Sequence, residues 1–378
     1  MPAPRRRGVG RGSTASSSAW RRSSSRGDRR RSPASTRRCR SSGTRRARRR
    51  RMGADPVVEA NAFLQESAPA VWAALSPLGR RALQPADFLP LQSAEARGKP
   101  FNATIGQITD GHGKAVPLPS MAAALAGLDE TELSRAFLYS PVEGLPELRR
   151  AWRDWQRRGV KPEIPSSLPV VTVGTAQARM LAAELFAGAG RRVILPHPCR
   201  EGDRELFAER LKADPFPCAC TEGGHFDPAA ISWHLADLPE GEPAVVLLQF
   251  PREATGYAPV SRERAALGSA LTAQAERRPL VVIVDDTWEG LGTPSASLFW
   301  TLAGRHPNLI PLKVDGADGQ LGFPGGRVGF LTFPCEPESD LARSLESKTK
   351  MLLRAAVGSP PAVTQVILLR ALRALLGV

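Results

Sequence analysis

The chain has 378 residues, of which 42% are hydrophobic, and a formal net charge of +15. This length allows a large core in one or two domains, and no apolar run approaches the length of a membrane span, which excludes an integral membrane protein. The five cysteines form no disulfide framework and no secretory signal is present, so we expect a cytoplasmic location.

The excess of positive charge lies entirely in residues 1–52, which hold 19 arginines, no lysine and a single acid, Asp28. The other 326 residues therefore carry a net charge of −3. A Ser/Arg/Gly/Pro segment of this kind buries too little apolar surface to fold, so we predict a disordered tail. Three explanations stay open: a nucleic-acid-binding arm, an organelle transit peptide, or an extension upstream of a start at Met52. The abrupt change of composition at Met52 favours the last.

Residues 53–100 are predicted to form an N-terminal helical arm. From residue 168 onwards, short runs rich in Val, Ile and Leu alternate with helical segments. Continuous apolar runs are typical of strands buried on both faces, so we predict a three-layer α/β/α domain over 101–345 with a mostly parallel sheet. The predicted strands lie within residues 168–174, 191–198, 243–250, 279–288, 308–314 and 327–333.

Two of the predicted helices have recognisable ends. The helix over 178–190 is predicted to end on glycine, and the helix over 261–278 to open on Ser261 as its N-cap. Residues 346–378 are predicted to be helical around a break at 358–361.

Ligands of open parallel sheets bind at the carboxyl ends of the strands, so the residues at the strand tips are the candidates for a binding site. Gly174, Thr175 and Ala176 form a strand-to-helix turn whose free N–H groups can hold a phosphate. Asp285 ends a buried strand, and is either a turn former or a charge aimed into the cleft. Arg327 follows two glycines, and is either an anion-binding group or an ordinary surface arginine.

These features, in this order, resemble the class I/II aminotransferases, which are pyridoxal-phosphate (PLP) enzymes of fold type I. The last of the matching stretches contains residues 315–320, which line up with the family sequence Asp-Gly-Ala-Thr-Lys-Glu. The stretches that carry the resemblance are residues 101–120, 139–155, 171–178, 249–257, 281–291 and 314–333.

The resemblance implies a role for each matching position. Asp285 would keep the pyridine nitrogen of PLP protonated, so that the ring can accept electrons. The turn over residues 174–176 and Arg327 would hold the cofactor phosphate, and Tyr139 would face the cofactor. The family reaction is amino-group transfer from an amino acid to a 2-oxo acid, and a homodimer is expected.

Several positions depart from the family pattern. Glu253 stands where the family has an asparagine that donates to the ring hydroxyl, and a carboxylate cannot donate unless it is protonated. Trp288 replaces a tyrosine that is a second partner of the same hydroxyl. Cys199 and Arg200 stand where the family has an aromatic residue that stacks on the ring.

The largest departure is at Gly319, which occupies the position of the Schiff-base lysine, eight residues before Arg327. Glycine can neither bond to the cofactor nor move a proton. Lys313 is six residues away, and six residues of extended strand span about 20 Å, so it cannot substitute. Residues 346–378 are interpreted as the start of a connection to a small domain that the sequence lacks.

The leading hypothesis is therefore an aminotransferase-like protein with impaired chemistry and no catalytic residue assigned, which binds PLP noncovalently if it binds it at all. A non-catalytic PLP-sensing or dimerisation module is the first alternative, and nucleic-acid binding through the tail is the second. No metal site is predicted, because Cys218, Cys220 and His225 do not make a tetrahedral set.

Overall fold

The computed structural model describes residues 56–82, 89–99, 104, 106, 108–110, 112–161, 163–222, 225–253, 255–291 and 296–378. The chain divides into two compact units, Met1–Gly53 and Ala54–Val378, and every described residue belongs to the second. The Arg-rich segment, with its three explanations, lies outside the described residues.

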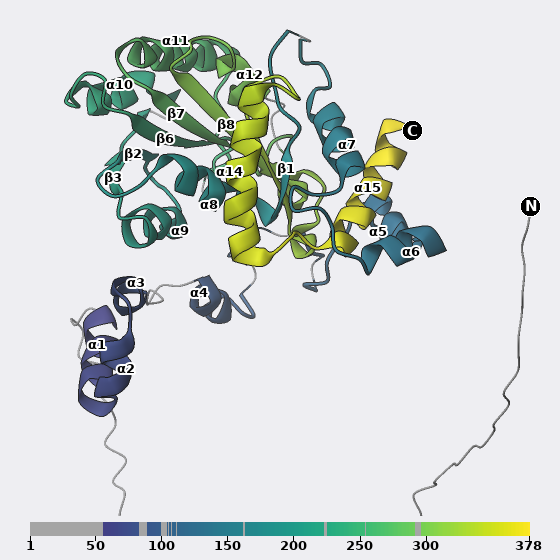
Figure 1. The fold of residues 1–378 in the computed structure, drawn as a ribbon, viewed down its shortest axis with the longest axis horizontal. Helices are drawn as coiled ribbons and strands as arrows, with labels where there is room; N and C mark the ends of the chain where they lie inside the picture. The colour runs from purple at the N-terminus through teal and green to yellow at the C-terminus, as the bar shows by residue number, and fades with distance from the viewer. Residues whose placement is uncertain are drawn as a thin grey trace, which may run out of the picture. The chain divides into compact units, whose positions relative to one another are not determined.

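A seven-stranded sheet in the order β1-β9-β8-β7-β6-β2-β3 forms the centre of the second unit (Figure 1). Neighbouring strands are parallel, except that β9 is antiparallel to both β1 and β8. The prediction of a mostly parallel sheet is confirmed. The strands are β1 (Val170–Val173), β2 (Arg192–Pro196), β3 (Asp214–Cys218), β6 (Ala244–Gln249), β7 (Leu280–Asp285), β8 (Leu309–Gly316) and β9 (Val328–Thr332), and a separate two-stranded ribbon is formed by β4 (Thr221–Glu222) and β5 (His225–Phe226).

Helices cover both faces of this sheet. One face packs on α10, α11 and α12, and the other packs on α8 and α14, whereas α5, α7 and α15 surround the end near β1 and β9. The helices that take part are α5 (Pro119–Ala126), α6 (Glu130–Ala136), α7 (Pro146–Gln156), α8 (Gly174–Phe186), α9 (Glu201–Arg204), η1 (a π-helix, Glu205–Arg210), α10 (Pro228–Ala236), α11 (Ser261–Arg277), α12 (Leu298–Leu302), α13 (Ala317–Gln320), η2 (a 3₁₀-helix, Pro324–Gly326), α14 (Asp340–Val357) and α15 (Ala362–Leu376). Earlier in the chain lie α1 (Pro56–Ser67), α2 (Pro69–Ala74), α3 (Pro77–Arg81) and α4 (Leu89–Glu95).

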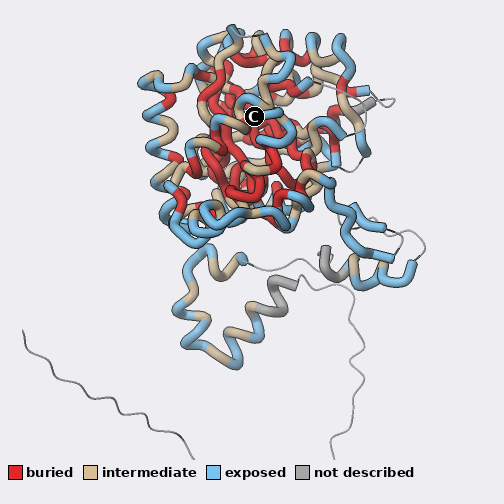
Figure 2. The backbone as a smooth tube through the Cα atoms, turned by 90° about the vertical axis from the view of Figure 1, so that its right-hand side faces the viewer, coloured by how far each residue is buried: buried red, intermediate tan, exposed pale blue. Residues whose placement is uncertain are grey.

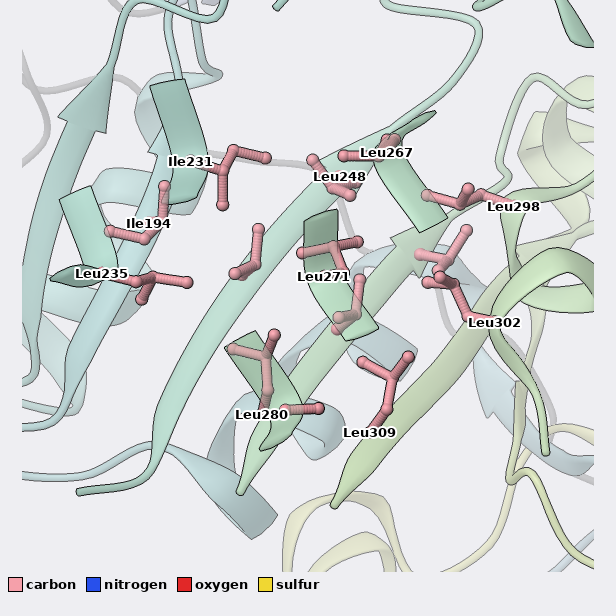
Figure 3. Packing of buried hydrophobic residues seen from close by; sticks show 14 of the residues in the cluster. Ile194, Ile231, Leu235, Leu248, Leu267, Leu271, Leu280, Leu298, Leu302 and Leu309 are labelled. Carbon is pink, nitrogen blue, oxygen red and sulfur yellow. The ribbon is translucent and has the colours of Figure 1, made fainter. Parts of the chain in front are cut away.

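The core follows directly from the apolar runs of the sequence. Figure 2 shows the buried residues gathered in the strands and in the helix faces that cover them. On the α11 side, Leu248 of β6, Leu271 of α11 and Leu302 of α12 pack together (Figure 3). Each fully buried side chain of this size contributes about 1.5–3 kcal/mol, so this packing holds the strand ends in fixed positions.

Two predicted helix ends differ from the structure. The N-cap of α11 is Val260 rather than Ser261, because the Glu263 carboxylate accepts a hydrogen bond from the Val260 N–H at 2.9 Å and stabilises an earlier start. α8 ends at Phe186 with Ala187 extended, and the glycines that follow lie in the turn towards β2, where Gly190 donates to the Lys212 carbonyl. The break between α14 and α15 falls at the predicted Gly-Ser-Pro-Pro.

The edge strand β3 was not predicted. Its prolines, Pro215 and Pro217, pair with Val193 and Leu195 of β2. Proline is tolerated in an edge strand, because its missing N–H is on the side that has no neighbouring strand.

Candidate functional site

The carboxyl ends of β1, β7 and β8 lie at one edge of the sheet. β9 lies between β1 and β8 and is antiparallel to both, so β1 runs parallel to β8 and β7, and β9 begins at this edge. The turn at Gly174, the acid Asp285, Gly319 and Arg327 therefore come together, although they are up to 153 residues apart in sequence.

Asp285 is the last residue of β7 and its side chain is fully buried. Thr287 donates to Oδ1 from its backbone N–H at 3.0 Å and from its hydroxyl at 2.5 Å. Arg179 donates to Oδ2 from Nη1 at 2.9 Å, and Arg200 donates a second, very short bond to the same oxygen. Burial acts to raise the pKa of Asp285, but the charges of Arg200 and Arg179 outweigh it and hold this pKa well below its ordinary value.

The two arginines are joined by a second acid, Asp203. Arg179 Nε lies 3.0 Å from Asp203 Oδ1, and Arg200 Nε lies 2.9 Å from Asp203 Oδ2. Two arginines and two carboxylates thus alternate in one buried cluster, which we call the Arg–Asp quartet (Arg179, Arg200, Asp203 and Asp285). Arg179 and Asp203 were not predicted as site residues, and Arg200 was predicted only as a departure from an aromatic position. The i, i+3 spacing of Arg200 and Asp203 is the sequence feature that indicates their ion pair.

The predicted phosphate turn lies at the start of α8. Gly174 has φ +72, and a Cβ built on it would lie 2.3 Å from Arg327 Nη2, so the guanidinium rests directly on the glycine backbone. Arg327 Nη1 donates to Asp318 Oδ2 at 3.0 Å, and the Thr175 hydroxyl lies 3.5 Å from the same oxygen. Arg327 therefore covers the turn, and it is already paired with an acid of this chain.

Gly319 lies in α13 with no free space around it. A Cβ built there would lie 2.1 Å from the Thr287 carbonyl oxygen and 2.8 Å from Cε3 of Trp288. Both distances are shorter than real Cβ contacts, so this backbone leaves no room for any side chain at position 319.

The sequence model of the family described as aminotransferase class I and II matches residues 99–376, most of the described chain. The chain belongs to the class I and II aminotransferase family. This finding confirms the predicted family, which is one that uses PLP.

Solved aminotransferase structures share the fold. An aminotransferase from Anaerococcus prevotii superposes with a TM-score of 0.64 at 18% identity, covering 74% of this chain and 70% of the other. A double mutant of Thermus thermophilus aspartate aminotransferase gives 0.62 at 21% identity, covering 80% and 73%. The broad-specificity aminotransferase from Leishmania mexicana gives 0.61 at 20% identity, covering 79% and 74%. At these identities the likeness establishes the α/β fold.

Trp288, which the resemblance predicts to stand at the position of a tyrosine, lies between two glycines. Its ring carbon Cη2 would lie 2.8 Å from a Cβ on Gly106, and its Cε3 would lie at the same distance from a Cβ on Gly319. The indole thus occupies the space beside α13. Glu253, which the resemblance predicts to stand at the position of an asparagine, has its Oε2 3.4 Å from Arg200 Nη1 and extends the Arg–Asp quartet outward.

Tyr139 lies on the segment that follows α6. Its side chain is 98% exposed, and Phe137 beside it is 89% exposed. In the single chain, Tyr139 therefore does not line the site.

A second buried charge cluster lies on the opposite face of the sheet, where Lys313 of β8 pairs with Val284 of β7. Lys313 Nζ contacts Asp286 by a very short bond, Glu289 Oε2 at 2.6 Å and Asp315 Oδ2 at 3.4 Å. Burial raises the pKa of Asp286 to about 8 and that of Asp315 to about 6, against the lowering effect of Lys313. The pKa of Lys313 itself is raised, because the neighbouring carboxylates outweigh its burial.

Among the described helices, none is long and apolar enough to cross a membrane. In the same part of the chain, no three His, Cys, Asp or Glu side chains are arranged to hold a metal ion. Cys218 and Cys220 are both buried, and their sulfurs lie 2.6 Å apart.

Proposed function

We propose that this chain is a non-catalytic aminotransferase homologue, which keeps the large-domain fold and parts of the PLP pocket but has lost amino-group transfer. The observation that carries the proposal is the packing of Gly319. The position assigned to the Schiff-base lysine has no side chain, and the Thr287 carbonyl and Trp288 fill the space that a side chain would enter. An active member would transfer an amino group from an amino acid to a 2-oxo acid through that lysine.

Lys313 does not compensate for the missing lysine. Its side chain is 1% exposed, it is held by Asp286 and Glu289, and it lies on the α11 side of the sheet, whereas Asp285 pairs with Arg179 of α8 on the other side. A lysine amine must be neutral to attack a carbonyl carbon, and the surrounding carboxylates keep Lys313 charged.

The residues at the site do not fit the cofactor. Both oxygens of Asp285 accept hydrogen bonds from Thr287, Arg179 and Arg200, and Nη1 of Arg327 donates to Asp318. The positions assigned to the pyridine nitrogen and to the phosphate are therefore both engaged within the chain, which supports a protein without PLP chemistry.

Borohydride reduction tests this proposal. The purified protein is mixed with PLP, reduced, digested and analysed by mass spectrometry, with an aminotransferase that retains the lysine treated in parallel. We expect stoichiometric labelling of one lysine in the control enzyme and none in this protein, together with no turnover of amino acids with 2-oxo acids. Stoichiometric labelling of a single lysine, Lys313 included, would show that the chemistry persists.

A dimerisation module is the second candidate, and one surface feature favours it. Leu133, Phe137, Leu138 and Tyr139 are 45%, 89%, 65% and 98% exposed and follow one another around the end of α6. Large apolar side chains gathered in this way mark interaction sites, and the partner proposed is a second copy of this chain. Light scattering should give a dimer that Phe137→Ser weakens, whereas a monomeric wild type would reject this candidate.

A further inference from the structure

The carboxylate of Asp285 has no acceptor capacity left. An ionised carboxylate offers about four lone-pair sites, and four donors reach Asp285: the N–H and hydroxyl of Thr287, one guanidinium N–H of Arg179 and one of Arg200. An external N–H, such as that of a protonated pyridine, can bind only if one of these donors leaves.

Arg200 is the donor best able to leave. It stands at the start of the short helix α9 and its side chain is 25% exposed, whereas the Arg179 side chain is 13% exposed and belongs to the long helix α8. Arg200 gives Asp285 what a protonated ring nitrogen would give it, which is a positively charged N–H in a buried setting.

The opposite charge is supplied at the other end of the site. Asp318 is 9% exposed, and its Oδ2 binds Arg327 at 3.0 Å beside the first turn of α8. The Thr175 hydroxyl and backbone N–H, together with Arg327, oppose the rise in the pKa of Asp318 that its burial causes. A carboxylate thus occupies the groups that suit a phosphate, namely a guanidinium and the N-terminus of a helix.

We infer that Arg200 and Asp318 are internal substitutes for the two charged ends of PLP, the guanidinium replacing the protonated ring nitrogen and the carboxylate replacing the phosphate. This inference rests on the proposed loss of transamination, and goes beyond it: the chain fills its own cofactor site, its stability is independent of PLP, and it cannot act as a PLP sensor. Asp318, the residue aligned with the family threonine, excludes phosphate from the position beside Arg327 and the first turn of α8.

Thermal unfolding with PLP, inorganic phosphate or pyridoxal tests the inference. The wild type should show the same Tm with each of them. Asp318→Thr removes the internal anion and restores a hydroxyl, and should gain a rise in Tm of about 5 °C at a ligand concentration about 100 times Kd, with PLP and with phosphate but not with pyridoxal. Asp318→Asn, which keeps the size of the side chain, should gain the same response.

The double variant Arg200→Ala/Asp318→Thr should respond more strongly to PLP than to phosphate, since the ring end is then open as well. Asp340→Thr is the matched control, because Asp340 is also an acid paired with an arginine but its side chain is 97% exposed; it should respond to none of the probes.

A rise in Tm of the wild type with PLP, without a borohydride-trapped lysine, would overturn the inference while leaving the loss of chemistry intact. The absence of any phosphate response in both Asp318 variants would overturn it too. A trapped lysine would instead overturn the proposed function, so the two failures are distinguishable.

Discussion

Gly319→Ala is expected to destabilise the protein strongly, although the substitution adds one methyl group. The new Cβ would lie 2.1 Å from the Thr287 carbonyl oxygen, so this oxygen would have to move by roughly 1 Å to reach a normal contact. Thr287 cannot move freely, because its N–H and hydroxyl are both bonded to Asp285. Overpacking of a core costs about 1–3 kcal/mol, and we expect about 3 kcal/mol here, because backbone rather than a side chain must move.

Urea unfolding followed by far-ultraviolet circular dichroism measures this loss. Gly325→Ala is the matched control in the same loop, because a Cβ at position 325 meets nothing within 4 Å. It should leave the free energy of unfolding unchanged or raise it by about 0.4–1 kcal/mol, since alanine restricts the unfolded chain. Equal stabilities of the two variants would refute the argument that position 319 is closed to a lysine.

Three further predictions concern the buried charges. Asp285→Asn should lower the free energy of unfolding by about 3–5 kcal/mol at pH 7, because Arg179 and Arg200 each lose one of their carboxylate partners. Since the folded pKa of Asp285 is lowered, the stability advantage of the wild type is present above the ordinary pKa of 3.8 and is lost as pH falls below it, which an acid titration of both proteins measures. Lys313→Met should lower the free energy of unfolding by about 3–5 kcal/mol at pH 9 and by clearly less at pH 5, because Asp286, whose pKa is raised to about 8, takes up a proton in the folded state at the lower pH. Urea unfolding midpoints of both proteins at the two pH values measure this difference. An equal loss at both pH values would contradict the raised pKa of Asp286. Trp152→Phe removes the indole N–H that donates to Asp315 Oδ1 at 3.0 Å and should lower the free energy of unfolding by about 1–3 kcal/mol. The loss should be larger above pH 6 than below it, because the pKa of Asp315 is raised to about 6 and the bond to the ionised carboxylate is the stronger one. An unchanged pH dependence of thermal unfolding would show that this bond contributes nothing.

The architecture was predictable because strand character is local. Each predicted apolar run overlaps a strand of the observed sheet, although β8 extends two residues beyond its run to Gly316, and the break at Gly-Ser-Pro-Pro separates α14 from α15. The edge strand β3 was missed for an equally local reason, because its two prolines argue against a strand unless its position at the edge is known.

The site was predictable only in part. The order of motifs indicated Gly174, Asp285 and Arg327, and the spacing to Arg327 predicted that Gly319 stands at the position of the Schiff-base lysine. The partners of these residues were not predictable. Arg179, Arg200 and Asp203 come from α8, from the segment after β2 and from α9, and no local pattern in the sequence joins them to a strand end 82 or more residues later.

The sequence by itself indicated the fold class and the family, and it predicted Gly319 at the position of the Schiff-base lysine, because apolar periodicity and motif spacing are properties of the chain read in order. Only the tertiary structure decided that position 319 has no room for a side chain, that the Asp285 carboxylate already accepts four hydrogen bonds and that Asp318 binds Arg327. The physical reason is that excluded volume and charge pairing depend on distances of a few ångströms between segments far apart in the chain, and those distances exist only once the sheet has brought its strand ends together.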